Sequence, residues 1–215
     1  MMKYLVTGST GFVGSRLLGF LNTIKCDVRL LSRSEISDHE TVVCNLGKDR
    51  IPEHTLESVD TVFHLAGFAH DMQNSSKVED LYRAINVEAT VELARLAVEK
   101  GVKRFVFVSS IKAGGLPLSE YCASEGDQND PEGVYGKTKR EAELKLLKIG
   151  KESGMHVSII RPSLVYGPNV KGNLQLMLSG IKKGWFPPLP ETNNKRSMVH
   201  VDDLVQAILL VADED

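Results

Sequence analysis

Tyr135 and Lys139 are the two residues of this sequence whose types and spacing most directly suggest chemistry. They stand four residues apart in Tyr135-Gly136-Lys137-Thr138-Lys139, at the start of a helical pattern, so both lie on one face of the helix. A free phenol has a pKa near ~10, and a neighbouring ammonium can lower it by roughly 1–3 units. We therefore expect Lys139 to lower the pKa of Tyr135 and to make it a general acid or base, although such pairs also arise by chance on surface helices.

A glycine-rich turn near the N-terminus offers a second kind of chemistry. It follows the short apolar run Lys3 to Val6 and opens a helical pattern. Gly8 permits a tight turn, Gly11 lets a pyrophosphate approach the backbone, and Gly14 lets helix and strand pack closely. The helix N-terminus adds unpaired N–H groups, which favour an anion over the alternative of a turn without a ligand. The predicted dinucleotide-binding residues are Gly8, Ser9, Thr10, Gly11, Phe12, Val13 and Gly14.

The end of the second apolar run bears on which dinucleotide binds. It reads Leu31-Ser32-Arg33-Ser34, without a carboxylate. An acidic residue here favours NAD, whereas a basic one accommodates the 2′-phosphate of NADP. We therefore predict that Ser32 and Arg33 bind the 2′-phosphate, with NADP(H) preferred and NAD(H) as the second choice. The alternative is a solvated loop arginine.

Composition narrows the class of protein. The 215 residues are 42% hydrophobic and 25% charged with a net charge of -2, so neither a nucleic-acid partner nor a membrane partner is expected. Apolar runs are too short for a signal segment or a membrane span, which predicts a cytoplasmic location. Three scattered cysteines suit neither disulfides nor a metal knuckle. His64 and His70 lack the helical spacing of a zinc site, so no metal is predicted.

The chemistry-bearing residues need a scaffold, and the periodicity predicts one of the α/β class. Short β-rich runs alternate with longer helical patterns, which is typical of a Rossmann-like, doubly wound parallel sheet. The candidate strands are Lys3 to Val6, Val28 to Leu31, Thr41 to Val43, Thr61 to His64, Arg104 to Val108 and Val157 to Ile160. The candidate helices are Phe12 to Ile24, Val78 to Lys100, Tyr135 to Ser153, Leu174 to Lys183 and Leu204 to Ala212.

Two segments depart from this alternation. Ala113 to Gly133 is rich in Gly, Ser, Asp and Pro and predicts a long loop, which in compact domains is usually functional. After Ile160 the pattern loosens into the proline-broken stretch around Phe186 to Pro190. We therefore divide the chain into a Rossmann domain, residues 1–163, and a partial substrate-binding region, residues 164–215, interleaved with it.

The order of these motifs resembles a known superfamily. The glycine turn, Ser109-Ser110 after the fifth strand, and Tyr135 with Lys139 resemble the short-chain dehydrogenases/reductases. The turn and Arg161-Pro162-x-x-Val165-Tyr166-Gly167-Pro168 resemble its extended branch, the nucleotide-sugar epimerases, dehydratases and ketoreductases. Members of this branch continue for about 100 residues more, on typical domain sizes. The C-terminal substrate-binding lobe is therefore expected to be incomplete.

The resemblance implies roles for individual residues. Tyr135 would be the catalytic acid/base, Lys139 would tune it and hold the nicotinamide ribose, and Ser110 would hydrogen-bond the reacting substrate oxygen. Ser109 is the alternative if the register differs by one residue, and capping of the strand end is the alternative for both serines. The same resemblance places six more residues at the cofactor: Asn45, Leu46, Leu65, Ala66, Gly67 and Pro162.

Two residues that the resemblance places at the cofactor, Asn45 and Asn86, match the family less simply. Asn45 stands where the branch often has Asp beside the adenine, so that contact is a departure from the pattern. Asn86 matches an asparagine that shapes the central helix and sometimes relays protons, and a purely structural role is the alternative.

On the substrate side, the resemblance implies that Asn173 and Arg196 bind the diphosphate of a nucleotide sugar, with a UDP-sugar expected. The implied reaction is hydride transfer at C4 of a UDP-linked hexose or N-acetylhexosamine, in surface-polysaccharide synthesis. Arg33 favours a reductase over a UDP-glucose 4-epimerase with retained NAD, and Ser110-Ile111-Lys112 disfavours a dehydratase. A cofactor-binding regulatory protein without turnover is the alternative of another class. The branch also implies a homodimer.

Overall fold

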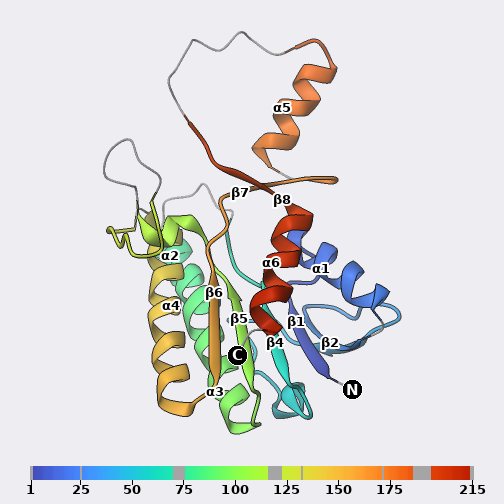
Figure 1. Ribbon diagram of the computed structural model, residues 1–215, viewed down its shortest axis with the longest axis vertical. Helices are drawn as coiled ribbons and strands as arrows, with labels where there is room; N and C mark the ends of the chain where they lie inside the picture. Colours follow the sequence, from blue (N-terminus) through green and yellow to red (C-terminus); the bar gives the residue numbers. More distant parts are fainter. Residues whose placement is uncertain are drawn as a thin grey trace.

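Six parallel strands form the centre of the molecule. The computed structural model describes residues 2–24, 26–69, 76–115, 123–131, 133–170, 172–185 and 195–213. The strand order is β3-β2-β1-β4-β5-β6, that of the Rossmann fold, and this confirms the predicted fold class (Figure 1). The strands are β1 Lys3–Thr7, β2 Asp27–Ser32, β3 Glu40–Val43, β4 Thr61–His64, β5 Arg104–Val108 and β6 His156–Ile160.

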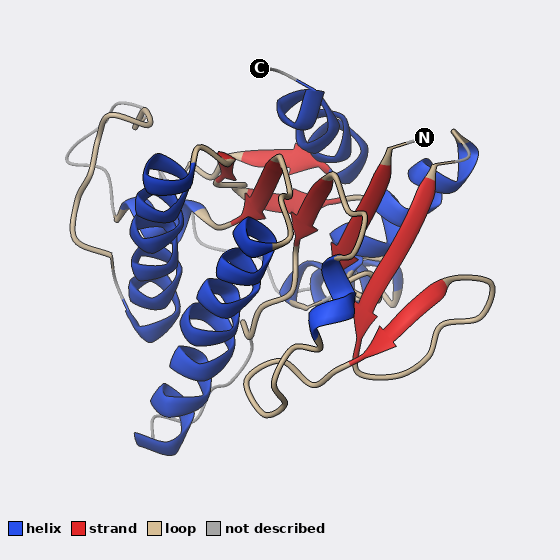
Figure 2. Ribbon diagram, turned by 90° about the horizontal axis from the view of Figure 1, so that it is seen from below, coloured by secondary structure: helices blue, strands red, loops and turns tan. Residues whose placement is uncertain are grey.

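Helices cover both faces of this sheet, which explains why its strands are nearly continuous apolar runs (Figure 2). Helices α1, Phe12–Thr23, and α6, Val201–Asp213, pack on one face. Helices α3, Ala89–Glu99, and α4, Gly133–Ser153, pack on the other. Successive strand residues alternate between the two cores, so that Leu5 faces α3 and α4 while Val6 faces α1 and α6.

The helical pattern predicted from Val78 to Lys100 is not one continuous α-helix. It consists of α2, Ser76–Arg83, a π-helical segment, Ala84–Glu88, and then α3. The widened turn surrounds the buried Asn86, whose side chain is hydrogen-bonded outside the helix. Gly101 and Gly154 end their helices with φ of 72° and 78°, a conformation that glycine adopts without strain.

The segment predicted as a loop, Ala113 to Gly133, is partly helical at its edges. A short 3-10 helix, η3, covers Ile111–Gly114 and extends into the predicted loop. A second 3-10 helix, η1, covers Glu53–Leu56 elsewhere in the chain. Helix α4 begins at Gly133, two residues before Tyr135. Residues 116–122 and 132 of this predicted loop lie outside the described residues.

The loosened region after Ile160 contains two short strands that the periodicity did not predict. Strands β7, Leu164–Tyr166, and β8, Met198–His200, pair in parallel as a separate sheet. Helix α5, Asn173–Lys182, lies between them in the chain and extends beyond the main sheet in Figure 1. Helix α6 then returns to pack against α1 and the main sheet. Among the described residues, no helix is long and apolar enough to cross a membrane.

Candidate active site

The glycine turn has the geometry expected for close approach of a ligand to the backbone. Gly8 has a φ of 71°, and the N–H of Gly11 donates to its carbonyl over 2.9 Å. A Cβ atom on Gly8 would lie 2.7 Å from the nitrogen of Ala66, and one on Gly14 would lie 2.1 Å from the carbonyl oxygen of Gly8. Each of these two positions therefore excludes any side chain, and α1 packs directly on the turn.

The residues of this turn fit a bound dinucleotide. The first turn of α1 has no acidic residue and its N-cap, Gly11, supplies no side-chain cap, so the N–H groups are free for an anion. The hydroxyl of Ser9 is buried and has no hydrogen-bond partner among the described residues. An unpartnered buried donor at such a turn is one that a phosphate oxygen would satisfy.

A buried hydrogen-bond chain holds the strand end opposite the turn. The Thr7 hydroxyl accepts from the N–H of Ala66 over 3.0 Å and lies 2.7 Å from Nδ1 of His64. Nε2 of His64 lies 2.9 Å from the hydroxyl of Thr90. Burial, and secondarily the charge of Lys139, lowers the pKa of His64 to about 3, so the ring is neutral. Its two nitrogens link the hydroxyls of Thr7 and Thr90. His64 thus positions the segment after β4. In the described part of the chain, no group of three or more His, Cys, Asp or Glu residues could hold a metal ion.

Tyr135 and Ser110 meet at the carboxyl edge of the sheet. Ser110 follows β5 and caps η3 by accepting from the N–H of Lys112 over 3.3 Å. Its side chain is also hydrogen-bonded to Tyr135. Ser109 is buried, donates its N–H to Ile160, and has a hydroxyl without a partner among the described residues. The side chain that meets the phenol is therefore that of Ser110.

The pKa of Tyr135 does not behave as the sequence predicted. Burial raises it, the hydrogen bond from Ser110 lowers it, and the nearby Tyr82 raises it further. Lys139 does not lower it here, because its Nζ donates to the carbonyl of Val108 over 2.9 Å and lies 4.3 Å from the ring centre of Phe107. The expectation that Lys139 lowers the pKa of this phenol is wrong.

Lys139 is itself strongly perturbed. Its side chain is 3% exposed, and burial lowers the pKa of the ammonium from 10.5 to about 7, against the opposing effect of Glu143. A Cβ atom on Gly67 would lie 3.4 Å from Nζ of Lys139 and 3.3 Å from Oδ1 of Asn86. Gly67, the last residue of the predicted segment Leu65, Ala66 and Gly67, therefore lies against the lysine, where a Cβ atom would make a tight contact.

Helix α4 is held in place by an ion pair that the sequence did not suggest. Arg161 donates from Nε to Glu143 over 2.9 Å and from Nη2 over 2.5 Å, and Glu143 is 1% exposed. Arg140 lies within 3.7 Å of the same carboxylate. The one available signal was the position of Glu143, four residues after Lys139 on the same helix face. The pair ties the helix that carries Tyr135 to the end of β6.

The residues predicted at the adenosine end lie after β2 and β3. The carbonyl of Ser32 accepts from the N–H of Cys44 over 2.8 Å, and Arg33 is exposed, without an ion pair to any residue that the structure describes. Asn45 and Leu46 follow β3 and are half-buried; the N–H of Asn45 donates to Asp49 over 2.7 Å. The parallel register of β2 and β3 thus brings these residues to one edge of the sheet.

Pro162, predicted at the cofactor, and Asn173 and Arg196, predicted at the substrate, make no described contact with Tyr135 or Lys139. Pro162 accepts from the N–H of Ile111 over 3.2 Å and therefore lies beside η3. Arg196 is exposed before β8. Asn173 opens α5, but its side chain lies outside the described residues. A cavity of about 250 Å³ joins the glycine turn to the C-terminal region and is lined by Thr10, Gly11, Phe12, Ser15, Arg16, Pro168, Asn169 and Val201.

The comparison with protein families decides the assignment. The model of the NAD dependent epimerase/dehydratase family matches residues 4–215. This chain belongs to that family. Membership agrees with the strand order, the glycine turn and the placement of Tyr135, Lys139 and Ser110 at one edge of the sheet.

Individual relatives in the family are named for sugar chemistry. The UDP-glucose 4-epimerase of Vibrio cholerae is 39% identical over 97% of this chain and 66% of its own length. The N-acetyl-alpha-D-glucosaminyl-diphospho-ditrans,octacis-undecaprenol 4-epimerase of Escherichia coli O157:H7 is 29% identical over 95% of this chain and 61% of its own length. The chain thus spans 61–66% of the length of these curated relatives.

The solved structures agree on the fold. MoeE5 in complex with UDP-glucose and NAD superposes with a TM-score of 0.83 at 28% identity, covering 98% of this chain and 72% of that one. MoeE5 in complex with UDP-glucuronic acid and NAD gives a TM-score of 0.85 at 27% identity, with 99% and 73% covered.

Proposed function

We propose that the chain acts at C4 of a UDP-linked hexose or N-acetylhexosamine by hydride transfer with NAD(P)(H), and that it is a 4-epimerase. The observation that carries this proposal is the hydrogen bond between Tyr135 and Ser110, at the same sheet edge as the glycine turn and Lys139. The 4-epimerase names of its relatives, at 39% and 29% identity, support the reaction.

The roles of the residues follow from their surroundings. Tyr135 takes the proton of the sugar C4 hydroxyl and later returns it to the C4 oxygen, while Ser110 donates a hydrogen bond to that oxygen. When bound, the nicotinamide supplies the hydride acceptor and donor for the sugar C4. Because burial and Tyr82 raise the pKa of Tyr135, we infer that a positive charge beside the phenol is needed before it can act as a base. Lys139, when protonated, would contribute such a charge only if its Nζ turned from the carbonyl of Val108 toward the phenol.

The dinucleotide would be held by the turn from Gly8 to Gly14, with the hydroxyl of Ser9 facing its phosphates. The segment Leu65 to Gly67 would pass its ribose and nicotinamide, with Asn45 and Leu46 near its adenine and Pro162 beside η3.

A panel of UDP-sugars tests the proposal directly. UDP-glucose, UDP-galactose and their N-acetylated forms are incubated with the protein and NAD, and the C4 epimers are separated by chromatography. Tyr135→Phe should lower turnover by about 10²-fold or more and leave NADH binding nearly intact. Tyr4→Phe is the matched control. Tyr4 lies on β1, its ring packs against that of Phe63, and it is outside the site. Full activity of Tyr135→Phe contradicts the assigned role.

A second candidate function, a 4-ketoreductase that prefers NADP(H), rests on Arg33. This guanidinium is exposed at the end of β2 and is free of ion pairs with the described residues, which leaves it available for a 2′-phosphate. Stoichiometric consumption of NADPH with a 4-keto sugar would establish the reductase, and Arg33→Ala should then weaken NADPH binding but not NADH binding. NAD-dependent interconversion of sugars without net cofactor consumption establishes the epimerase. Cofactor binding without either activity would favour the regulatory alternative.

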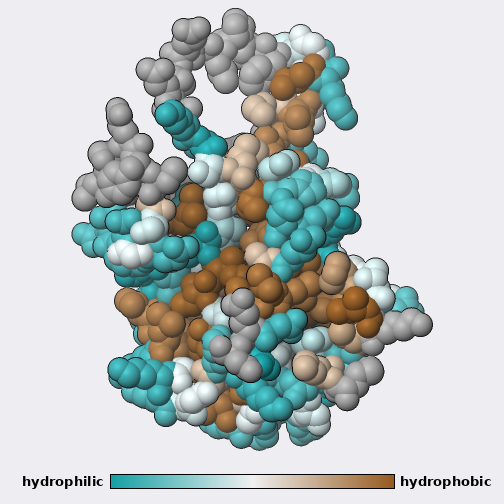
Figure 3. All heavy atoms as spheres, viewed as in Figure 1, coloured by the Kyte–Doolittle hydropathy of each residue, from teal (hydrophilic) through white to brown (hydrophobic). Residues whose placement is uncertain are grey.

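We propose further that residues 164–215 form a partial substrate-binding region interleaved with the Rossmann domain. Its apolar side chains on and after α5 are exposed, among them Leu176, Ile181 and Trp185, and Figure 3 shows apolar atoms gathered on this helix. Arg196 and Asn173 would contact the diphosphate of the sugar nucleotide. Arg196→Ala should raise the KM for the UDP-sugar with little effect on NADH binding, and an unchanged KM would refute the assignment.

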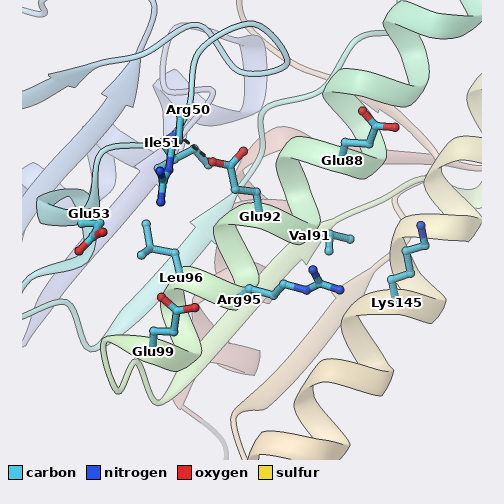
Figure 4. Close-up of a pocket in the computed structure, with 10 residues that line it drawn as sticks. All are labelled: Arg50, Ile51, Glu53, Glu88, Val91, Glu92, Arg95, Leu96, Glu99 and Lys145. Carbon is cyan, nitrogen blue, oxygen red and sulfur yellow. Dashed lines mark hydrogen bonds between the residues drawn. The ribbon is translucent and has the colours of Figure 1, made fainter.

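A homodimer through α3 and α4 is also proposed. Two hollows of about 460 and 630 Å³ lie on the outer faces of these helices. Figure 4 shows Arg95 and Glu99 on α3 and Lys145 on α4, with the apolar Val91 on α3 between Glu88 and Arg95. A face that carries both charge signs around apolar residues suits a second copy across a two-fold axis. Arg95→Glu should shift the chain from dimer to monomer in sedimentation experiments. A cytoplasmic location and a role in surface polysaccharides stay predictions.

A further inference from the structure

The π-helical segment Ala84–Glu88 places Asn86 where it contacts two other parts of the chain. Oδ1 of Asn86 accepts from the N–H of Phe68 over 2.7 Å, and Nδ2 donates to the carbonyl of Phe68 over 3.0 Å. The second N–H of the same amide donates to the hydroxyl of Thr138 over 3.2 Å. Asn86 is 1% exposed, so these three bonds satisfy a buried amide without water.

Thr138 completes this network from the first turn of α4. Its hydroxyl lies 2.9 Å from the carbonyl of Val134 and 3.0 Å from that of Tyr135, and it donates its proton to these oxygens. The same oxygen accepts from Asn86, so the hydroxyl acts both as a donor and as an acceptor. Thr138 is therefore bonded both to the backbone of the turn that carries Tyr135 and to the amide that holds Phe68.

The two segments joined in this way flank Lys139. Nζ of Lys139 and Oδ1 of Asn86 lie 3.4 and 3.3 Å from the place a Cβ of Gly67 would occupy. The backbone of Gly67 is therefore confined between the lysine and the asparagine amide. A shift of α4 along its axis would move Tyr135 and Lys139 relative to the segment that ends at Phe68.

We propose that Thr138 is a positioning residue, whose hydroxyl sets the first turn of α4 against the segment Gly67 to Phe68 by way of Asn86. The inference rests on the proposed function, in which that segment passes the nicotinamide and Tyr135 moves the proton. The network fixes the distance between the proton-transferring group and the place of hydride transfer. Neither Thr138 nor Asn86 needs to touch the reacting atoms.

Thr138→Val tests the hydroxyl, because valine keeps the shape and removes the donor and the acceptor. We expect kcat to fall by roughly 10- to 100-fold, the scale of effect that follows a displacement of about 1 Å, with the KM for the UDP-sugar and the affinity for NADH nearly unchanged. Thr138→Ser should restore kcat to near the wild-type value. Wild-type kcat in Thr138→Val, or equal losses in the valine and serine variants, overturns the proposal.

Two further variants separate positioning from general damage. Thr55→Val is the matched control, since Thr55 is buried with no partner for its hydroxyl among the described residues, and its kcat should equal that of the wild type. In an Asn86→Ala background, Thr138→Val should cause little additional loss, because the shared bond is already broken. If the kcat of the double variant falls by the product of the two single-variant losses, the proposal is overturned. Thr138→Ala replaces the valine variant if that variant does not fold.

Hydrogen exchange decides the inference even if no sugar is turned over. Thr138→Val should speed amide exchange in two separate places, residues 133–139 and residues 66–69, whereas Thr138→Ser should not. An inactive wild-type chain with this exchange pattern refutes the proposed function and retains the network. An active chain in which exchange and kcat are both unmoved refutes the network alone.

Discussion

Replacing Gly14 with alanine tests whether the tight packing of α1 on the glycine turn is required for the site. A Cβ atom there would lie 2.1 Å from the carbonyl oxygen of Gly8, 2.8 Å from its carbonyl carbon and 3.0 Å from Cα of Ser9. All three are backbone atoms, so no side-chain rotation can relieve the contact. The helix and the turn must separate by roughly 1 Å, and overpacking of this kind costs about 1–3 kcal/mol.

The expected result is a double loss. The free energy of unfolding should fall by about 2–3 kcal/mol, which is a large part of the ~5–15 kcal/mol that holds a typical domain folded. NADH affinity should fall as well, because the separated turn no longer presents its N–H groups at one point. Urea unfolding measures the first quantity and NADH fluorescence titration measures the second.

Gly19→Ala is the matched control on the same helix. Gly19 is exposed, and a Cβ there meets nothing within 4 Å. Alanine in an exposed helix interior is favoured over glycine by about 0.5–1 kcal/mol, so this variant should be more stable and should bind NADH normally. If Gly14→Ala and Gly19→Ala change stability and binding equally, the packing argument for the turn is refuted.

Two further predictions concern buried titratable groups. Because the pKa of His64 falls from 6.5 in the unfolded chain to about 3 in the folded one, the unfolded chain binds the extra proton between these values. Stability should therefore fall as the pH drops from 6.5 to 3, by up to about 1.4 kcal/mol per pH unit from this group, and His64→Asn should flatten that slope in urea titrations; an unaltered slope would contradict the burial argument. Glu143→Gln should lower the free energy of unfolding by about 3 kcal/mol, since it leaves Arg161 without its partner, whereas Glu141→Gln, in an exposed pair with Arg83 on the same helix, should lower it by under ~1 kcal/mol. Equal losses in these two variants would show that burial does not distinguish the pairs.

The scaffold of the site was predictable because parallel strands carry a strong sequence signal. Strands covered on both faces are nearly continuous apolar runs, as in Arg104–Val108 after its first residue, and the glycine spacing after β1 has few structural interpretations. The parallel register then brings residues that follow different strands, such as Ser32 and Asn45, to one edge.

What the sequence did not predict depends on contacts between distant residues. Strands β7 and β8 are three residues each, and every pairing between them joins positions 34 residues apart, as for Leu164 with Met198. The π-helical segment keeps the apolar periodicity of its neighbours closely enough to read as one helix. The raised pKa of Tyr135 depends on burial and on where Nζ of Lys139 finds its acceptor, which spacing along a helix cannot give.

The arrangement of α1 and α6 has a consequence for how the chain reaches its folded state. The face of the sheet next to the cofactor turn is covered by α1 and by α6, whose buried Leu204, Val205 and Ile208 pack in the same core as Val6 and Leu17. During synthesis, the first helix leaves the ribosome almost two hundred residues before its packing partner does. Until α6 arrives, the side of α1 and the part of the sheet at β5 and β6 that it covers stay open to solvent and to other chains. Contacts of such long range close slowly, so this face is where an unfinished polypeptide would need a chaperone.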